Sequence, residues 1–216
     1  MADAAHRQRR LAAKVARRKA VVAGKRMLEA SSASLVGRIR VAAKGSVVRC
    51  MMSSTLFELG IGHVIVARAL PSGLLGCAYF LLDVFCLGIK DVFYAEIGQT
   101  ELRSRLAEQD DVQSFIDIEA AYARKLIRDA AAYAASLGLS VAKDTPVIEA
   151  IFGDVDAGAC TETFAFGKDG KPFFVSGPND TPARIRSVSQ ILARSQGSGG
   201  WDYLVEVPPD LSFLRE

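Results

Sequence analysis

The sequence predicts an α+β protein: a mainly antiparallel sheet built from hairpins, helices packed on one face of it, and a basic helical arm at the N-terminus. Two observations predict the body. Strand patterns occur in adjacent pairs joined by turns, and a long helical period follows them instead of alternating with single strands. A third observation, the clustering of basic residues before residue 50, separates the arm from the body. We expect an arm and hinge over 1–45, one domain over 46–207 and a tail over 208–216.

The arm is expected to form a helix over residues 7–30, because this stretch consists largely of good helix formers and contains no proline. Its apolar positions Leu11, Val15 and Val22 make only a thin stripe, and like charges at spacings of three and four oppose the helix. We therefore expect the arm to be frayed in isolation and ordered on a partner. The Ser-Ser-Ala-Ser stretch at 31–34 is typical of a hinge.

The first half of the body has a strong hairpin pattern. A short helical turn is expected at 55–59. Residues 63–70 are rich in valine and isoleucine, and a second apolar run over 74–84 follows the turn Pro71-Ser72-Gly73. Two such runs joined by a turn of this composition predict a β-hairpin. We expect a third strand over 91–97.

A helical period follows from about residue 101 to 137. Apolar side chains recur there at spacings of three and four, at Tyr122, Leu126, Ala130, Tyr133 and Leu137. Gly138 supplies a C-terminal cap, so the pattern predicts one long amphipathic helix. A short helix opened by Pro146 is expected over 146–152.

Residues 161–176 carry the clearest hairpin pattern in the chain. Two phenylalanines alternate with small residues, and the Asp169-Gly170 pair is a preferred two-residue turn. We expect a helix over 181–195 and a last strand over 201–207.

Composition and cysteine usage favour a cytoplasmic protein. Half of the residues are hydrophobic, so the body is expected to bury a substantial core. The cysteines Cys50, Cys77, Cys86 and Cys160 show no CxxC spacing, which favours reduced, structural thiols. The most apolar run, 74–89, has 16 residues and contains an aspartate, short of the roughly 20 that cross a bilayer. No membrane-spanning segment is therefore expected, and the leading interpretation includes no membrane partner.

The cationic start lacks an apolar segment behind it, so no secretory signal is expected. An arginine- and alanine-rich start also resembles a mitochondrial transit peptide. Asp3 and the lack of early serine argue against that alternative.

Charge divides the chain sharply. Residues 1–50 hold 13 lysines and arginines against Asp3 and Glu29, a formal net charge of +11, whereas residues 51–216 carry a net charge of −8. A cationic arm on an acidic body predicts a polyanionic partner, for which nucleic-acid phosphates are the leading candidate. The candidate contacts are Arg7, Arg9, Arg10, Lys14, Arg17, Arg18, Lys19, Lys25 and Arg26.

The arm contains no Phe, Tyr or Trp to stack on bases, so we expect it to position the protein rather than to read single strands by sequence. An acidic protein or a membrane surface is an alternative partner. The arm could also act as a solubilising tail or fold back on the acidic body.

A second candidate site lies between residues 83 and 96. If neighbouring strands bring Asp83 and Asp91 together with Glu96, the grouped carboxylates would hold Mg²⁺ for phosphodiester cleavage. Asp83 follows an apolar run, and a buried carboxylate needs a partner. An Asp83–Lys90 pair at the end of a strand is therefore the structural alternative.

Common catalytic motifs do not occur: the sequence has no P-loop, GxGxxG, HExxH or GxSxG. This counts against the common nucleotide-binding, zinc-protease and serine-hydrolase classes. A nucleophile pair of Cys86 and His63 stays open, although nothing in the spacing places the two side chains together. The weak catalytic candidates are Asp83, Cys86, Lys90 and Asp91, and whether the protein is an enzyme stays open.

The loop before Thr181 is a third candidate. Thr181 followed by Pro182 predicts a helix start, with a hydroxyl cap ahead of proline in the first turn. Free N–H groups at a helix start attract anions, and Gly177, Thr181 and Arg184 would form such a site. Asp180 places a negative charge at the same end, which favours ordinary capping.

Three stretches of the sequence together carry a resemblance to a family of proteins. They are TLFELGIG from Thr55 to Gly62, LDVFCLGIKD from Leu82 to Asp91, and FGKDGKPFF from Phe166 to Phe174 continuing into SGPNDTPAR from Ser176 to Arg184. Together they resemble a family of uncharacterised bacterial proteins of about this size, many with a Lys/Arg-rich start. The resemblance covers roughly residues 46–204 and implies a bacterial cytosolic origin. It brings no established activity.

The sequence therefore favours a non-catalytic nucleic-acid- or ribosome-associated binding protein that uses its cationic arm, with RNA or the ribosome favoured over DNA and no cofactor. One alternative is a metal-dependent enzyme acting on nucleic acid, with Mg²⁺ on Asp83 and Asp91. Another is a protein–protein module of a stress or defence system.

Overall fold

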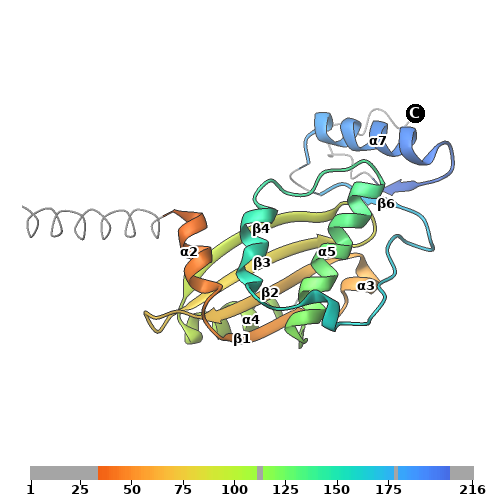
Figure 1. Cartoon of the computed structure of the whole chain (residues 1–216). Helices are drawn as coiled ribbons and strands as arrows, with labels where there is room; N and C mark the ends of the chain where they lie inside the picture. Colours follow the sequence, from red (N-terminus) through yellow and green to blue (C-terminus); the bar gives the residue numbers. More distant parts are fainter. Residues whose placement is uncertain (1–33, 111–113, 178–179, 205–216) are drawn as a thin grey trace, which may run out of the picture.

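The structure, a computed structural model, describes residues 34–110, 114–177 and 180–204. Its centre is a five-stranded antiparallel sheet in the order β4-β3-β2-β1-β5 (Figure 1). The strands are β1 (Val47–Ser53), β2 (Ile61–Ala69), β3 (Leu75–Asp83), β4 (Gly88–Ile97) and β5 (Phe115–Asp117). β2 and β3 pair along their whole length, from Ile61 opposite Asp83 to Ala69 opposite Leu75. The predicted hairpin is therefore confirmed.

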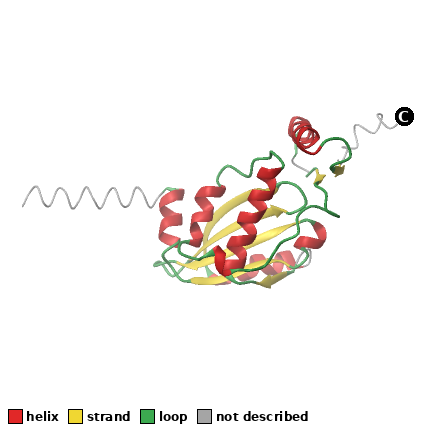
Figure 2. Ribbon diagram, turned by 45° about the vertical axis from the view of Figure 1, so that its right-hand side comes forward, coloured by secondary structure: helices red, strands yellow, loops and turns green. Residues whose placement is uncertain are grey.

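Helices cover both faces of the sheet, which explains why β3 is apolar without interruption. Alternate strand residues point to opposite faces. Ala78, Phe80 and Leu82 join the larger core under α5 (Ala120–Ser136), whereas Cys77 and Tyr79 join a second core on the other face. Leu102 of α4 (Gln99–Asp110) packs into that second core, and α4 lies on the side of the sheet away from α5 (Figure 2). The α+β class is confirmed, with α4 added on the second face.

The packed body begins earlier than the expected boundary at residue 46. Helix α2 (Leu35–Ala42) starts at Ser34, whose hydroxyl accepts the N–H of Gly37 at 3.1 Å. Ile39 and Ala42 of this helix are fully buried in the larger core. The basic composition of the region conceals this short apolar stripe. The expected helix over 7–30 and the first three residues of the expected hinge lie outside the described residues.

The expected single helix over 101–137 is wrong, because the chain forms α4, then β5, then α5. β5 pairs antiparallel with β1, a strand that the sequence reasoning missed. The N–H of Ile118 also donates to the carbonyl of Cys50 at 3.0 Å. Pairing with the edge of β1 thus overrides the helical pattern over these few residues.

The expected hairpin over 161–176 is also wrong, although its turn forms. Lys168 and Lys171 exchange two backbone hydrogen bonds of 2.8 and 3.0 Å around Asp169 and Gly170, both at positive φ. No strand ladder continues from this turn, because Phe164 and Phe166 pack on α5. Their rings lie 5.0 Å from Tyr122 and 5.1 Å from Tyr133, respectively, so aromatic packing on the helix replaces strand pairing.

The C-terminal part of the described chain forms a smaller layer beside the main sheet (Figure 1). β6 (Phe173–Val175) pairs in parallel with β7 (Asp202–Leu204), and α7 (Pro182–Gln196) connects them. As predicted, Thr181 caps α7: its hydroxyl accepts the N–H of Arg184 at 3.2 Å. The remaining elements are short: α3 (Leu56–Leu59), α6 (Thr145–Glu149) and the 3₁₀ turns η1 (Ala150–Phe152) and η2 (Ala157–Ala159). Among the described helices, none is both long and apolar enough to cross a membrane.

Candidate functional site

Asp83 closes the turn between β3 and β4. Its Oδ1 accepts the N–H of Cys86 at 2.9 Å and the N–H of Phe85 at 3.1 Å, and the side chain is buried. Burial raises the pKa of Asp83 to about 6, and the N–H of Cys86 and the charge of Lys90 oppose this rise. The carboxylate therefore stabilises a turn, and Lys90 interacts with it electrostatically. This arrangement is close to the structural Asp83–Lys90 pair that the sequence offered as an alternative to a metal site.

The other two carboxylates of the candidate metal site lie elsewhere on β4. Asp91 is exposed, pairs opposite Leu81, and accepts the N–H of Val92 at 2.8 Å. Glu96, near the other end of the strand, accepts the hydroxyl of Tyr94 at 3.3 Å. Within the described residues, no group of three or more His, Cys, Asp or Glu side chains could hold a metal ion. The expected grouping of Asp83, Asp91 and Glu96 is therefore not found.

Cys86 and His63 do not form a nucleophile pair. The Cys86 thiol is fully buried, and this burial, with the charge of Asp83 adding to it, raises its pKa to about 12. The thiol is therefore protonated at neutral pH. His63 lies near the start of β2, where burial lowers its pKa and Asp91 opposes the change. No hydrogen bond joins the two side chains in the described part of the chain.

Asp180 brings two of the predicted sites together. Its Oδ2 accepts the N–H of Gly177 at 2.7 Å and lies 3.6 Å from Nζ of Lys90, while its Oδ1 lies 3.0 Å from Nε of Arg184. The side chain of Asp180 is only 7% exposed. In the sequence, the negative charge of Asp180 counts against an anion site. In the structure, the same carboxylate holds two cations, Lys90 and Arg184, next to each other.

A cavity of about 440 Å³ lies between β4, residues 139–143 and α7. Its charged lining residues are all basic: Lys90, Lys143 and Arg184. Ser140 and Ser187 add hydroxyl groups, and the rest of the wall is mainly aliphatic, with Leu87, Ile89, Leu139, Val188 and Ile191. Lys143 makes no ion pair with a described residue. The sequence reasoning missed Lys143, Ser140 and Ser187, because nothing local marks them as neighbours of Lys90.

No family model, curated protein or solved structure matches the chain. The resemblance to a family of bacterial proteins stays a prediction.

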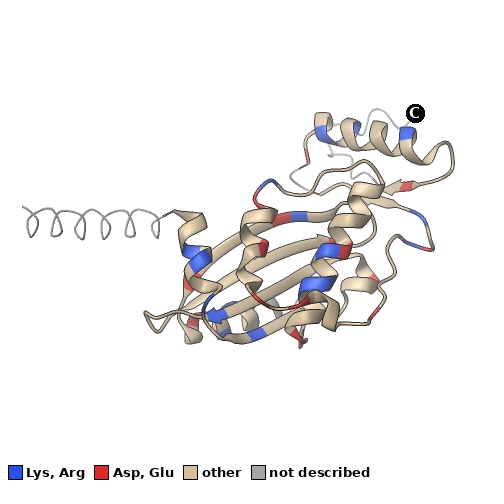
Figure 3. Cartoon of the chain, in the orientation of Figure 1, with Lys and Arg blue, Asp and Glu red and all other residues tan. Residues whose placement is uncertain are grey.

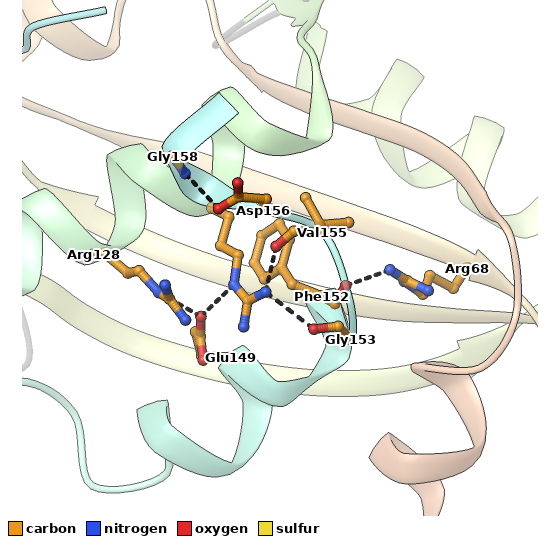
Figure 4. Close-up of polar contacts among 9 residues, drawn as sticks. Arg68, Arg128, Glu149, Phe152, Gly153, Val155, Asp156 and Gly158 are labelled. Atoms are coloured by element: carbon orange, nitrogen blue, oxygen red, sulfur yellow. Dashed lines mark hydrogen bonds and ion pairs between the residues drawn. The ribbon is translucent and has the colours of Figure 1, made fainter. Parts of the chain in front are cut away.

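A polar network near α5 has a structural role (Figure 4). Oε1 of Glu149 accepts Nε of Arg124 at 2.8 Å and Nε of Arg128 at 2.9 Å. Arg124 also donates to the carbonyls of Gly153, at 3.0 Å, and Val155. These bonds fix residues 149–155 against α5. The polar groups of the network therefore already have protein partners.

Ion pairs compensate many basic side chains of the body, but none on α2. The described pairs join Arg49 to Asp117, Lys90 and Arg184 to Asp180, Arg105 to Glu101, Lys125 to Asp129, and Arg124 and Arg128 to Glu149. Arg38 and Arg40 on α2, and Lys44 just after it, make no ion pair with a described residue. The only charged residues of α2 are basic (Figure 3). Basic residues without a described ion pair therefore continue along the sequence past the arm, onto α2 and Lys44. The nine predicted contacts of the arm lie outside the described residues.

Proposed function

We propose that the protein binds nucleic acid through its N-terminal basic segment, with RNA or the ribosome as the favoured target and DNA as the alternative. The observation that carries the proposal is the division of charge, +11 over residues 1–50 against −8 over residues 51–216. Phosphates attract such a segment without regard to base sequence, because binding releases counterions condensed on the nucleic acid. The proposed activity is binding, and no reaction is assigned to it.

The described part of the chain supports this proposal at the point where the arm joins the body. α2 follows the arm directly and is anchored by Ile39 and Ala42 in the larger core. Arg40 and Lys44 are exposed there. The net negative charge of the remaining body would be repelled by phosphates, so we expect the α2 end to face the nucleic acid and the rest to point away.

The test measures binding of a labelled RNA duplex to the full-length chain by fluorescence anisotropy at a series of salt concentrations. If about six phosphates are neutralised, the slope of log K against log salt should be roughly −5. The test variant replaces the nine lysines and arginines of residues 1–26 by glutamine. A control variant replaces three exposed arginines of the body, Arg103, Arg186 and Arg194, by glutamine.

The arm variant should lose most of the affinity and most of the salt dependence, whereas the control should keep both. Unchanged affinity and slope in the arm variant would sink the proposal. Repeating the titration with duplex DNA of the same length decides between the favoured target and its alternative.

A further inference from the structure

The cavity between β4 and α7 lies far from α2, the described part of the proposed nucleic-acid contact. α2 and α7 are at opposite ends of the molecule (Figure 1). Lys90 of the cavity and Glu96, which lines a hollow beside Arg38 of α2, are six residues apart on the same strand. Six residues of extended chain span roughly 20 Å. The basic charge of the cavity is therefore separate from the basic charge of α2.

The charges around the cavity suit a dianion. Lys90, Lys143 and Arg184 supply three positive charges, and the carboxylate of Asp180 offsets one of them. Asp83, which interacts electrostatically with Lys90, lowers the net positive charge by at most one further unit. The net charge is therefore +1 to +2. A phosphomonoester carries a charge of about −1.5 to −2 at neutral pH, so it would neutralise the site.

Two of the three cations, Lys90 and Arg184, are held in place by Asp180 before any ligand arrives. Asp180 binds Arg184 through Nε, and the terminal amino groups of the guanidinium have no hydrogen-bond partner among the described residues. The Arg184 side chain is 50% exposed. A guanidinium binds phosphate through two parallel N–H groups. The Lys90 side chain is only 16% exposed and is drawn to the same carboxylate. Less side-chain entropy is lost on binding when such groups are already ordered.

The aliphatic wall indicates that a bare anion is not the intended ligand. A volume of about 440 Å³ falls within the range of about 300 to 1,000 Å³ typical of small-molecule sites. The phosphate group would occupy only the basic part of it. The side chains of Leu139, Val188 and Ile191 offer an apolar surface for the remainder of the ligand.

We propose that this cavity binds a phosphomonoester attached to an apolar or aromatic body, of the kind found in a nucleoside 5′-monophosphate. The phosphate lies among Arg184, Lys143 and Lys90, and the attached group packs on the aliphatic wall. The same chemistry occurs in a free small molecule and at the 5′-phosphorylated end of a nucleic acid.

The test uses the full-length chain and adenosine 5′-monophosphate as the probe, with binding measured by calorimetry and by the shift in Tm. Adenosine lacks the phosphate, and inorganic phosphate lacks the apolar body. Two variants remove cations from the cavity, Lys143→Gln and Arg184→Gln. Arg194→Gln is the matched control, since Arg194 is an exposed arginine on the same helix that does not line the cavity.

We expect saturable binding of the nucleotide, weaker binding of adenosine and of inorganic phosphate, and a Kd raised about tenfold or more in each cavity variant. Arg194→Gln should leave the Kd unchanged. Lys143→Gln keeps the test valid if Arg184→Gln disturbs α7, because Lys143 has no ion pair with a described residue. The proposal is overturned by no saturable binding, by equal binding of inorganic phosphate, or by equal losses in Arg194→Gln.

A second comparison identifies the source of the ligand. Oligonucleotides with a 5′-phosphate or a 5′-hydroxyl are titrated with the full-length chain and with Lys143→Gln. A gain in affinity from the 5′-phosphate that disappears in Lys143→Gln supports the site and assigns it to nucleic-acid ends. Nucleotide binding without such a gain also supports the site, and assigns it to a free small molecule.

Discussion

Nη2 of Arg68 donates a hydrogen bond of 2.5 Å to the carbonyl oxygen of Phe152, which joins β2 to the turn after α6. The same guanidinium donates through Nη1 to the carbonyls of Ala43 and Gly45, each at 2.7 Å. Arg68 is 3% exposed, and its burial lowers the pKa of the guanidinium. One buried side chain thus ties α2, the sheet and the segment 150–153 together.

We expect Arg68→Met to destabilise the protein, because it leaves the three carbonyls without their donor. The expected loss is on the order of 3 kcal/mol in the free energy of unfolding, since each unsatisfied buried group costs about 1 to 3 kcal/mol. Urea unfolding followed by circular dichroism measures it. Arg68→Lys keeps one donor group, so its free energy of unfolding should lie between those of wild type and Arg68→Met. Equal stability of all three proteins would contradict this role.

Replacing Ile39 by alanine tests whether α2 belongs to the body. Ile39 is 1% exposed in the larger core, and truncation of such a side chain costs about 2 to 5 kcal/mol through lost burial and the cavity left behind. Val41 on the same helix is 38% exposed, so Val41→Ala is a matched control with an expected loss of about 0.5 kcal/mol or less. Chemical denaturation of both variants gives the comparison, and similar losses would place α2 outside the core.

Asp83→Asn is expected to change how stability depends on pH. Burial raises the pKa of Asp83 to about 6 in the folded protein, above the ordinary value of about 4. As pH rises from about 4 to 6, the carboxyl group ionises first in the unfolded chain, so wild type loses stability over this window. Asparagine keeps an oxygen for the N–H groups of Phe85 and Cys86 but cannot ionise.

The variant should therefore gain roughly 3 kcal/mol relative to wild type between pH 4 and pH 7. Urea titrations at a series of pH values measure the difference in the free energy of unfolding. Asp91→Asn, at an exposed position on β4, controls for the removal of one negative charge. A difference that stays constant with pH, or that has the opposite sign, contradicts the expected effect of burial.

The α2 cations should contribute to nucleic-acid binding if the proposed function is correct. Each phosphate contact adds about 0.9 to the slope of log K against log salt on duplex nucleic acid. The double variant Arg40→Gln, Lys44→Gln should therefore reduce the magnitude of the slope by about 1 to 2. The anisotropy titration described above measures it. An unchanged slope would confine the contact to residues before α2.

The fold was predictable where local pattern and tertiary environment agree. The apolar runs of β2 and β3 flank a turn and pair with each other directly, so their pattern is sufficient. Phe164 and Phe166 alternate like strand residues, but their partners are Tyr122 and Tyr133, which lie more than 30 residues earlier on a helix. Alternation cannot distinguish a partner strand from a helix surface.

The residues of the cavity likewise could not be grouped from local sequence pattern. Lys90 and Arg184 were both singled out from the sequence, but as members of separate sites. Asp180 brings them together in the fold. Its carboxylate lies beside Lys90, which is 90 residues earlier in the chain, and beside Arg184, which is four residues later. Lys143 lies in a loop with no motif, so only the packing of α7 beside that loop makes it a neighbour.

The parallel pairing of β6 with β7 makes the segment from 173 to 204 a unit that closes on itself around α7. Its apolar attachment to the main body runs through one cluster. In this cluster Phe174 of β6 and Val188 and Leu192 of α7 meet Cys86, Leu87, Ala134, Leu137 and Leu139. A unit that is joined to the rest of a protein through a single cluster can open below the free energy of global unfolding. We therefore expect the amides of α7 to exchange with deuterium as one cooperative group, faster than those of β2 and β3. Mass spectrometry of native-state exchange would show α7 as a separate foldon, able to detach while the five-stranded sheet stays intact.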